Sequence, residues 1–154
     1  MLQADLLRGL AEDEAERVLA LGNRLVLTAG AVLFQLGDTA DCIYLVARGR
    51  LRLTLPIQVA SREERVFVEE RSAGQTVGWS GLIPPYRFTL TATAPLESAV
   101  IALGREALGR YFSEHPETGY KVTQNLASVI GQRLQIFQTM WLREIERMVE
   151  LRCA

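Results

Sequence analysis

Few side chains in this sequence could carry out covalent or metal chemistry. The chain of 154 residues contains one histidine and two cysteines. His115 precedes a proline, as in a turn, and Cys42 lies in an apolar run typical of a buried strand. A metal-dependent barrel enzyme needs two or three histidines with a carboxylate. A Cys/His pair, a Ser-His-Asp set and a nucleoside-triphosphate loop are also missing from the sequence. We therefore expect no catalytic residues, no metal site and no enzyme activity.

The composition is that of a soluble globular domain without a surface for polyanions. Seventeen basic and eighteen acidic residues give a net charge of −1, and 49% of the residues are hydrophobic. The arginines are scattered among acids, so the basic stripe of a nucleic-acid-binding protein is missing. The N-terminus lacks the pattern of a signal peptide, and the longest apolar run, residues 42–47, is too short to cross a bilayer. We expect a cytoplasmic protein that contacts no membrane.

Any functional residue must be positioned by short strands that lie between two helical segments. Before residue 24, apolar residues recur at helical spacing, which predicts two short helices. Turn signals then separate β-rich runs, and residues 60–64 predict a polar hairpin loop. The β-rich runs are residues 25–27, 32–34, 42–46, 50–55, 66–68 and 99–103. This pattern predicts a mainly β fold, a double-stranded β-helix (jelly-roll) barrel with flanking helices.

The chain has the length of one domain, which we place at residues 1–154. Within it we expect N-terminal helices at residues 1–23, the β-barrel at 24–104 and C-terminal helices at 105–154. In the C-terminal part, a short helix from about residue 106 stops at His115-Pro116, and a long helix follows over about residues 117–152.

The long helix is too long to be covered by its own domain. At 1.5 Å per residue it would measure roughly 50 Å, against about 30 Å for a small domain. Its apolar positions step by three or four residues, which is typical of a coiled-coil seam. These positions are Leu126, Ile130, Leu134, Phe137, Trp141, Ile145 and Met148. Because an exposed apolar seam needs a partner, we expect a homodimer formed through this helix.

Spaced glycines and short segments agree with this order of elements. They are Gly30-Ala31-Val32-Leu33-Phe34, Gly37-Asp38-Thr39-Ala40-Asp41, Ile43-Tyr44-Leu45-Val46 with Gly49, then Gly74, Gly78, Phe112 with His115-Pro116-Glu117, and Arg133-Leu134. Together they resemble the cyclic-nucleotide-binding domain family, of the catabolite-activator type, over about residues 5–140. The resemblance implies a regulatory domain with a ligand held inside the barrel.

In that family a short glycine-led helix and loop wrap the phosphate of the ligand. The resemblance places this cassette segment at residues 78–89. Free N–H groups at a helix start attract an anion, and an arginine can bind phosphate with two hydrogen bonds. Arg87 falls at or within one residue of the phosphate arginine of the family. The implied ligand contacts are Gly78, Trp79, Ser80, Gly81, Leu82, Arg87, Phe88 and Thr89.

Trp79 is the main departure from the family pattern. The family places a glutamate there, which accepts a hydrogen bond from the ribose hydroxyl, whereas an indole has one donor and no acceptor. An unmet polar group costs about 1–3 kcal/mol. On the long helix, the resemblance places the base contacts near Phe137 and Gln138, where a phenyl ring could stack on a base. The cassette therefore implies weak or absent binding of cyclic AMP and cyclic GMP.

Several interpretations stay open from the sequence. The barrel could sense a cyclic nucleotide or another small anionic ligand, and no other cofactor is expected. Alternatively, the chain is a dimerisation domain that binds no ligand. Many relatives are transcription factors, but only a few residues follow the long helix, so we expect a stand-alone domain that does not contact DNA directly. An iron–sulfur sensor would need about four cysteines.

Overall fold

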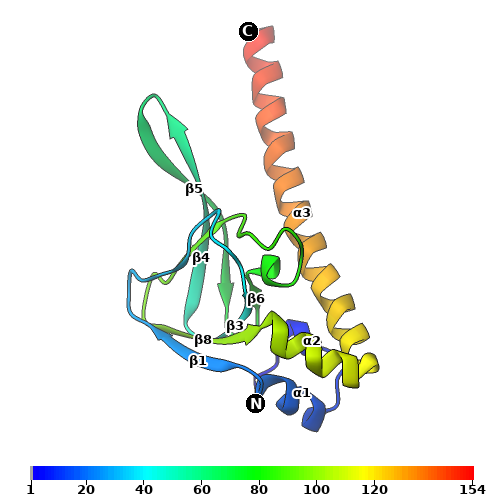
Figure 1. Cartoon of the computed structure of the whole chain (residues 1–154). Helices are drawn as coiled ribbons and strands as arrows, with labels where there is room; N and C mark the ends of the chain where they lie inside the picture. Colours follow the sequence, from blue (N-terminus) through cyan, green and yellow to red (C-terminus); the bar gives the residue numbers. More distant parts are fainter. Residues whose placement is uncertain (1) are drawn as a thin grey trace.

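The structure, a computed structural model, describes residues 2–154 as strands flanked by helices at both ends of the chain (Figure 1). The strands are β1 (Asn23–Leu27), β2 (Val32–Phe34), β3 (Cys42–Arg48), β4 (Arg50–Val59), β5 (Arg62–Ser72), β6 (Thr76–Val77), β7 (Thr91–Thr93) and β8 (Ser98–Gly104). The helices are the 3-10 turns η1 (Asp5–Leu7) and η2 (Trp79–Gly81) and the α-helices α1 (Glu12–Leu19), α2 (Arg105–Glu114) and α3 (Pro116–Cys153).

The strands form two antiparallel four-stranded sheets, in the orders β1-β8-β3-β6 and β2-β7-β4-β5. The predicted jelly-roll fold with a long C-terminal helix is confirmed. Over residues 2–154 the two sheets stay separate and do not close into a barrel. Sequence neighbours β4 and β5 pair as a hairpin, whereas β1 pairs with the distant β8.

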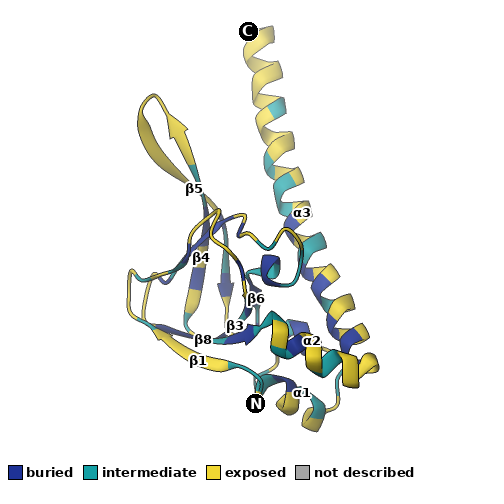
Figure 2. Cartoon of the chain, viewed as in Figure 1, coloured by how far each residue is buried: buried dark blue, intermediate teal, exposed yellow. Residues whose placement is uncertain are grey.

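The hairpin of β4 and β5 extends beyond the sheets, and its far end is exposed on both faces (Figures 1 and 2). Val59 pairs with Arg62, so the turn consists of Ala60 and Ser61, both at positive φ. The predicted loop at residues 60–64 is therefore too long. Polar residues continue into β5 because neither face of this part of the hairpin covers a core.

The predicted helices before residue 24 are present in a shorter form. The first is the single turn η1, whose residues Leu6 and Leu7 are buried, and the second is α1. At the other end, α2 stops at Glu114, and Pro116 begins α3, as proline does at a first helical position. The predicted long helix is confirmed. No helix within residues 2–154 combines the length and apolar character needed to cross a membrane.

Two clusters of buried side chains hold the domain together. The first lies between the sheets, and its members include Phe34, Leu51, Leu53, Phe88 and Leu90. The second joins β3 and β8 to the helices, and its members include Leu6, Ile43, Leu45, Leu108 and Leu126. The cassette segment contributes to both clusters: Trp79 of η2 packs on the second, and Phe88, near the end of the segment, belongs to the first. Figure 2 shows that burial on α3 ends about halfway along the helix.

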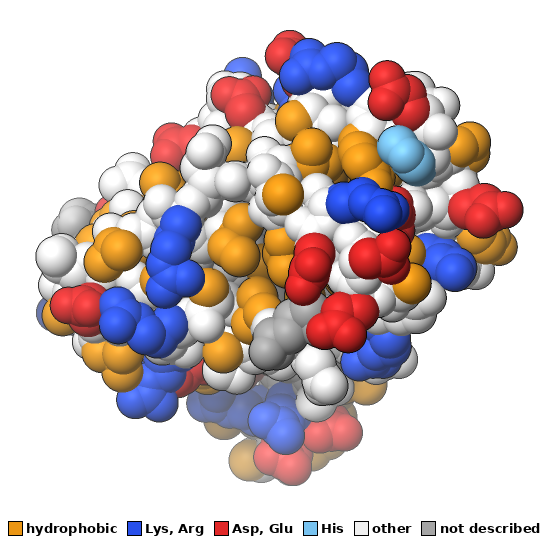
Figure 3. Space-filling view, turned by 90° about the horizontal axis from the view of Figure 1, so that it is seen from below, with side chains coloured by type: hydrophobic (Ala, Val, Ile, Leu, Met, Phe, Trp, Pro, Cys, Tyr) orange, Lys and Arg blue, Asp and Glu red, His pale blue; other side chains and the backbone are white. Residues whose placement is uncertain are grey.

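At the helical end of the molecule, the carboxylate of Glu14 ties α1 to both later helices. It accepts hydrogen bonds from the Tyr111 hydroxyl and the Thr118 hydroxyl, each at 2.7 Å, and pairs with Arg17 at 2.8 Å. The two hydroxyl hydrogen bonds, with Arg17, lower the pKa of Glu14 from its usual 4.5 to about 2. Figure 3, which views this end, shows acidic and basic side chains interspersed on the surface.

We expect the stability of the protein to depend on pH through Glu14. Its contribution is complete above its unfolded pKa of 4.5 and is lost as the pH falls towards the folded value of about 2. Glu14→Gln should therefore be less stable than the wild type at neutral pH. It should also lose less stability than the wild type as the pH falls from 4.5 to about 2. Urea denaturation at several pH values measures this, with Glu16→Gln, on the exposed face of α1, as the control. Parallel stability–pH curves for wild type and Glu14→Gln would contradict it.

Candidate functional site

The cassette segment begins with a glycine that the fold requires. Gly78 has φ 77°, a left-handed conformation that favours glycine. A Cβ atom at this position would lie 3.1–3.3 Å from the rings of Phe88, Tyr44 and Phe34. The helix that follows, η2, is a single turn of three residues. Its peptide dipoles therefore provide only a small part of the field that a longer helix would direct at an anion.

The cavity beside this segment is almost completely filled. Its volume is about 10 Å³, whereas a single water molecule needs about 10–15 Å³ by this measure. Its walls are Phe34, Leu53, Gly78, Trp79, Ser80, Phe88, Thr89, Leu90 and Arg133. In this conformation the site has no room for a nucleotide.

Aromatic side chains occupy the space between the sheets. The rings of Phe34 and Phe88 stack with their centroids 3.7 Å apart and an angle of 7° between their planes. Tyr44 packs beside Phe34 at 5.9 Å, and burial raises the pKa of its phenol. Phe88, which the sequence indicated as a ligand contact, is therefore a core residue here. Thr89 also borders the small cavity, although it is exposed.

Trp79 does not fill the space between the sheets. It is half-buried and packs against the helical core cluster, together with Leu82 and Ile83, and it also forms part of the cavity wall. Gly81 and Leu82, in the same segment, are not among the residues that line the cavity. The indole thus connects the cassette segment to the helices.

Arg87 lies outside the cavity, contrary to the expectation for a phosphate-binding arginine. Its guanidinium donates a hydrogen bond to the carbonyl oxygen of Gly37 at 3.0 Å, and its backbone forms a β-bridge with Thr39. The side chain is exposed. Pairing with the loop between β2 and β3 orients Arg87 away from the site, because the next residue, Phe88, is the one that turns into the core.

The two helix residues that we expected to contact a base face different sides of α3. Phe137 is half-buried against the core between the sheets, whereas Gln138 is exposed and does not line the cavity. Because helical neighbours differ in direction by about 100°, only one of them can face the sheets. Phe137 covers the core here, and Gln138 lies on the surface.

The predicted dimer seam also divides into two sets. Leu126 is buried in the helical core cluster, and Ile130 packs against it. By contrast, Leu134, Trp141 and Met148 are 58%, 65% and 52% exposed. Ile145 is partly buried. Leu126, Ile130 and Phe137 therefore pack on their own domain, whereas Leu134, Trp141 and Met148 are exposed.

A buried ion pair at the cavity was not expected from the sequence. Arg133 of α3 donates from Nε to a carboxylate oxygen of Glu69 at 2.9 Å, and its Nη2 contacts the same oxygen. Burial lowers the pKa of Arg133, and Glu69 opposes this effect. Alternation from Val66 and Val68 would turn Glu69 outward, but β5 has a bulge, since Leu53 pairs with Glu69 and Thr54 with Phe67. No simple sequence pattern signals this reversal.

Comparison with known proteins decides the family. A family model described as the cyclic nucleotide-binding domain matches residues 24–115. The chain belongs to this family. The cyclic AMP receptor protein of Thermus thermophilus is 27% identical over 135 residues, which cover 88% of this chain and 59% of that protein. The crystal structure of the catabolite activator protein of the same species has a TM-score of 0.71 and 26% identity, covering 96% of this chain and 62% of that chain.

Another relative carries the match as part of a larger protein. Glutaminase 1 of Bradyrhizobium diazoefficiens is 24% identical over 134 residues, which are 87% of this chain and 21% of that protein. The chain thus spans about a fifth of the glutaminase and about three fifths of the cyclic AMP receptor protein. The cyclic nucleotide-binding domain accounts for most of this chain.

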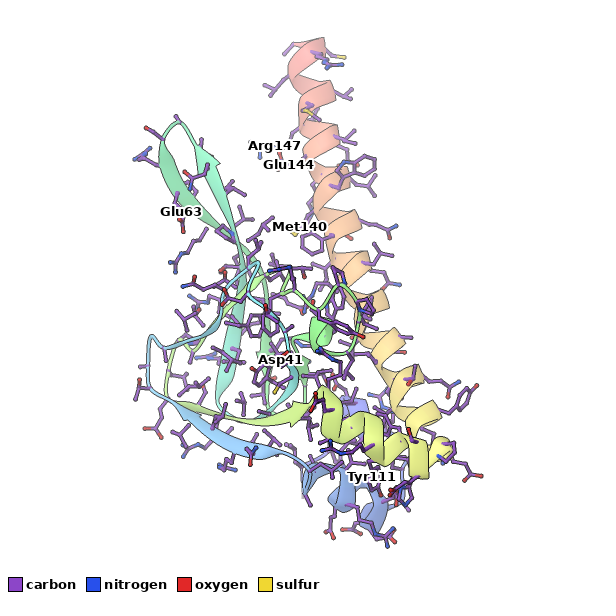
Figure 4. All side chains as sticks on the ribbon, viewed as in Figure 1. Asp41, Glu63, Tyr111, Met140, Glu144 and Arg147 are labelled. Carbon is purple, nitrogen blue, oxygen red and sulfur yellow. The ribbon has the colours of Figure 1, made fainter. Side chains whose placement is uncertain are left out.

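Arg105, the first residue of α2, fixes the cassette segment of this cyclic nucleotide-binding domain. Its Nη1 donates to the carbonyl oxygens of Ala40 at 2.7 Å and Gly81 at 2.9 Å. The guanidinium lies 3.7 Å from the ring centroid of Tyr86 and 3.5 Å from a carboxylate oxygen of Asp41. Figure 4 shows Asp41 between η2 and the start of α2. One side chain thus couples the cassette segment to the C-terminal helices.

Arg105→Ala is expected to loosen the cassette segment without unfolding the domain. The substitution removes two charge-assisted hydrogen bonds and a cation–π contact, at a cost of about 2–4 kcal/mol to the local structure. Amide hydrogen exchange over residues 79–87 should accelerate by about 30-fold or more, while exchange in β3 stays unchanged. Arg110→Ala, an exposed position on the same helix, is the control. Equal acceleration in both variants would show that Arg105 has no special role in the segment.

Proposed function

We propose that the chain is a regulatory domain that binds cyclic AMP and cyclic GMP weakly or not at all. The observation that carries this proposal is the cavity of about 10 Å³ beside the cassette segment. A stacked pair, Phe34 and Phe88, takes up the space between the sheets. Trp79 replaces the expected ribose-binding carboxylate, and Arg87 binds a backbone carbonyl instead of facing the cavity. The cavity, the expected ribose contact and the expected phosphate contact therefore all differ from the family pattern.

Titration with cyclic AMP and cyclic GMP tests the proposal. In Trp141→Phe, the indole of Trp79 is the single tryptophan and reports on the cassette segment. We expect neither its fluorescence nor the melting temperature to change at about 1 mM nucleotide. A ligand with a micromolar Kd would, at that concentration, stabilise the fold by about 4 kcal/mol. The Thermus cyclic AMP receptor protein serves as the positive control, and saturable micromolar binding by this chain would refute the proposal.

A second role, dimerisation through α3, is favoured by the exposed apolar residues in its distal half. Trp141, Leu142 and Met148 are each more than half exposed, at 65%, 53% and 52%. With 38 residues, α3 measures about 57 Å, and it extends past the sheets beside the β4–β5 hairpin (Figure 1). A second copy of the helix would cover this apolar surface. We propose a cytoplasmic homodimer that reaches any effector through protein contacts.

The groove between the hairpin and α3 is consistent with this arrangement. It has a volume of about 650 Å³, and its walls include Phe67 and Val68 from β5 and Ile136 and Met140 from α3. In Figure 4, Met140 points from α3 towards the hairpin, with Glu144 and Arg147 further along the same side. The distal helix is therefore accessible from this side as well as along its exposed apolar residues.

A further inference from the structure

The carboxylate of Glu69 lies between two buried arginines. Arg133 contacts it from α3 through Nε, at 2.9 Å, and Nη2, and Nη1 of Arg71 lies 3.8 Å away. The side chains of Arg133, Arg71 and Glu69 are only 9%, 7% and 13% exposed. Two buried guanidinium groups that converge on one position form a site for a small oxyanion, and the side chain of Glu69 supplies that anion.

The two arginines are held in different ways. Arg71 donates from Nε to the carbonyl oxygen of Thr76 at 3.1 Å and from Nη2 to Asp5 at 3.0 Å, so β6 and η1 fix its position. Asp5 in turn accepts hydrogen bonds from the backbone and the hydroxyl of Thr76. Arg133 has Glu69 as its carboxylate partner. The Glu69 carboxylate therefore connects Arg133 of α3 to this cluster by charge, in addition to the hydrogen bond that Asn125 of α3 donates to the carbonyl oxygen of Leu6 in η1.

This anion lies at the edge of the candidate ligand site. Arg133 forms part of the wall of the small cavity, and so does Leu53, the cross-strand partner of Glu69. On the basis of the function proposed above, we infer that Glu69 is a built-in anionic occupant that docks α3 on β5 without any ligand. The chemical class that the two-arginine site accepts is a small carboxylate, which this chain provides from its own β5.

Removing the carboxylate should create an empty anion site. In Glu69→Ala, the guanidinium of Arg133 remains buried without a carboxylate partner and Arg71 keeps only Asp5, which is strongly destabilising. The unfolding equilibrium constant should rise on the order of 100-fold or more. Acetate has the same charged group and fits the space of the deleted side chain, so it should bind between Arg71 and Arg133. Chloride screens charge but lacks the planar carboxylate group that matches the geometry of a guanidinium.

The test is chemical rescue of Glu69→Ala in sodium acetate against sodium chloride at equal ionic strength. We expect acetate to raise the melting temperature of this variant by several degrees more than chloride does. Wild type should show no such difference. Glu70→Ala is the matched control, because Glu70 is the next residue on β5 and pairs with Arg50 on the exposed face, where the side chains are 32% and 51% exposed. Equal responses to the two salts in Glu69→Ala would overturn the inference.

A second variant covers the case in which Glu69→Ala does not fold. Glu69→Gln keeps the size of the side chain and loses its charge, so the docking of α3 should weaken while the fold is retained. Hydrogen exchange over residues 126–140 should then be at least 10-fold faster than in Glu70→Gln, and equal rates would reject the inference. Neither the acetate rescue nor the hydrogen-exchange comparison uses nucleotide titration of the wild type. A failure here is therefore distinguishable from a failure of the proposed function.

Discussion

Trp141→Glu is expected to convert a homodimer of this protein into monomers. The indole is 65% exposed on the distal half of α3, with Leu134 and Met148 about two turns away on either side. Buried tryptophans in interfaces commonly contribute at least about 2 kcal/mol each. A twofold dimer contains the substitution twice, so the dimer dissociation constant should rise by about 1000-fold. Sedimentation velocity over a range of concentrations measures the change.

Tyr120→Glu is the control for this experiment. Tyr120 is also an aromatic residue on α3 and is 66% exposed, but it lies near the start of the helix, beside the rest of the domain. We expect this variant to remain a dimer. If Trp141→Glu stays dimeric, the interface lies elsewhere on the molecule. If both variants become monomers, the interface follows the whole length of α3 and is not confined to its distal half.

Phe88→Ala should cause the largest loss of stability among substitutions in the cassette segment. Its ring is 5% exposed and stacks on Phe34 in the core between the sheets. Truncation of a buried phenylalanine to alanine costs about 3–5 kcal/mol, because packing is lost and a cavity remains. This is a large part of the total stability of about 5–15 kcal/mol that is typical of a domain. Urea denaturation measures the change.

Phe67→Ala, a truncation of an exposed phenylalanine on β5, is the comparison for the loss of stability. Phe67 is 52% exposed, and its ring lies 6.0 Å from the guanidinium of Arg52. Loss of this exposed contact should cost less than about 1 kcal/mol. If Phe88→Ala were no more destabilising than Phe67→Ala, the site between the sheets would be able to open easily. The case for a filled nucleotide cavity would then fail.

Under the proposed function, internal contacts of this cyclic nucleotide-binding domain take the place of contacts to a ligand. The Phe34–Phe88 stack occupies the space between the sheets, and the Arg133–Glu69 pair holds α3 at its edge. Arg105 connects the cassette segment to α2. A ligand can shift such a domain only by binding one arrangement more tightly than the other. In this structure the stack and the ion pair form without a ligand.

The sequence by itself determined the order and type of the main elements. Periods of three to four residues marked α2 and α3, and His115-Pro116 marked the boundary between them, because proline is compatible with a helix start but not with its interior. Short β-rich runs separated by turn signals indicated the jelly-roll fold, and the spaced glycines, of which Gly78 needs its left-handed φ, indicated the family. These features are local, so neighbouring residues are sufficient to specify them.

The tertiary structure alone decided which side chains meet at the site. A bulge at Val68 turns Glu69 inward, where simple alternation would have placed Glu70. Pairing of Arg87 with the loop at Thr39 turns its guanidinium away and leaves Phe88 in the core. The face of a strand or helix that is covered depends on segments far away in the sequence. Only the folded chain shows which of these segments lies opposite, and so which residues can bind a ligand.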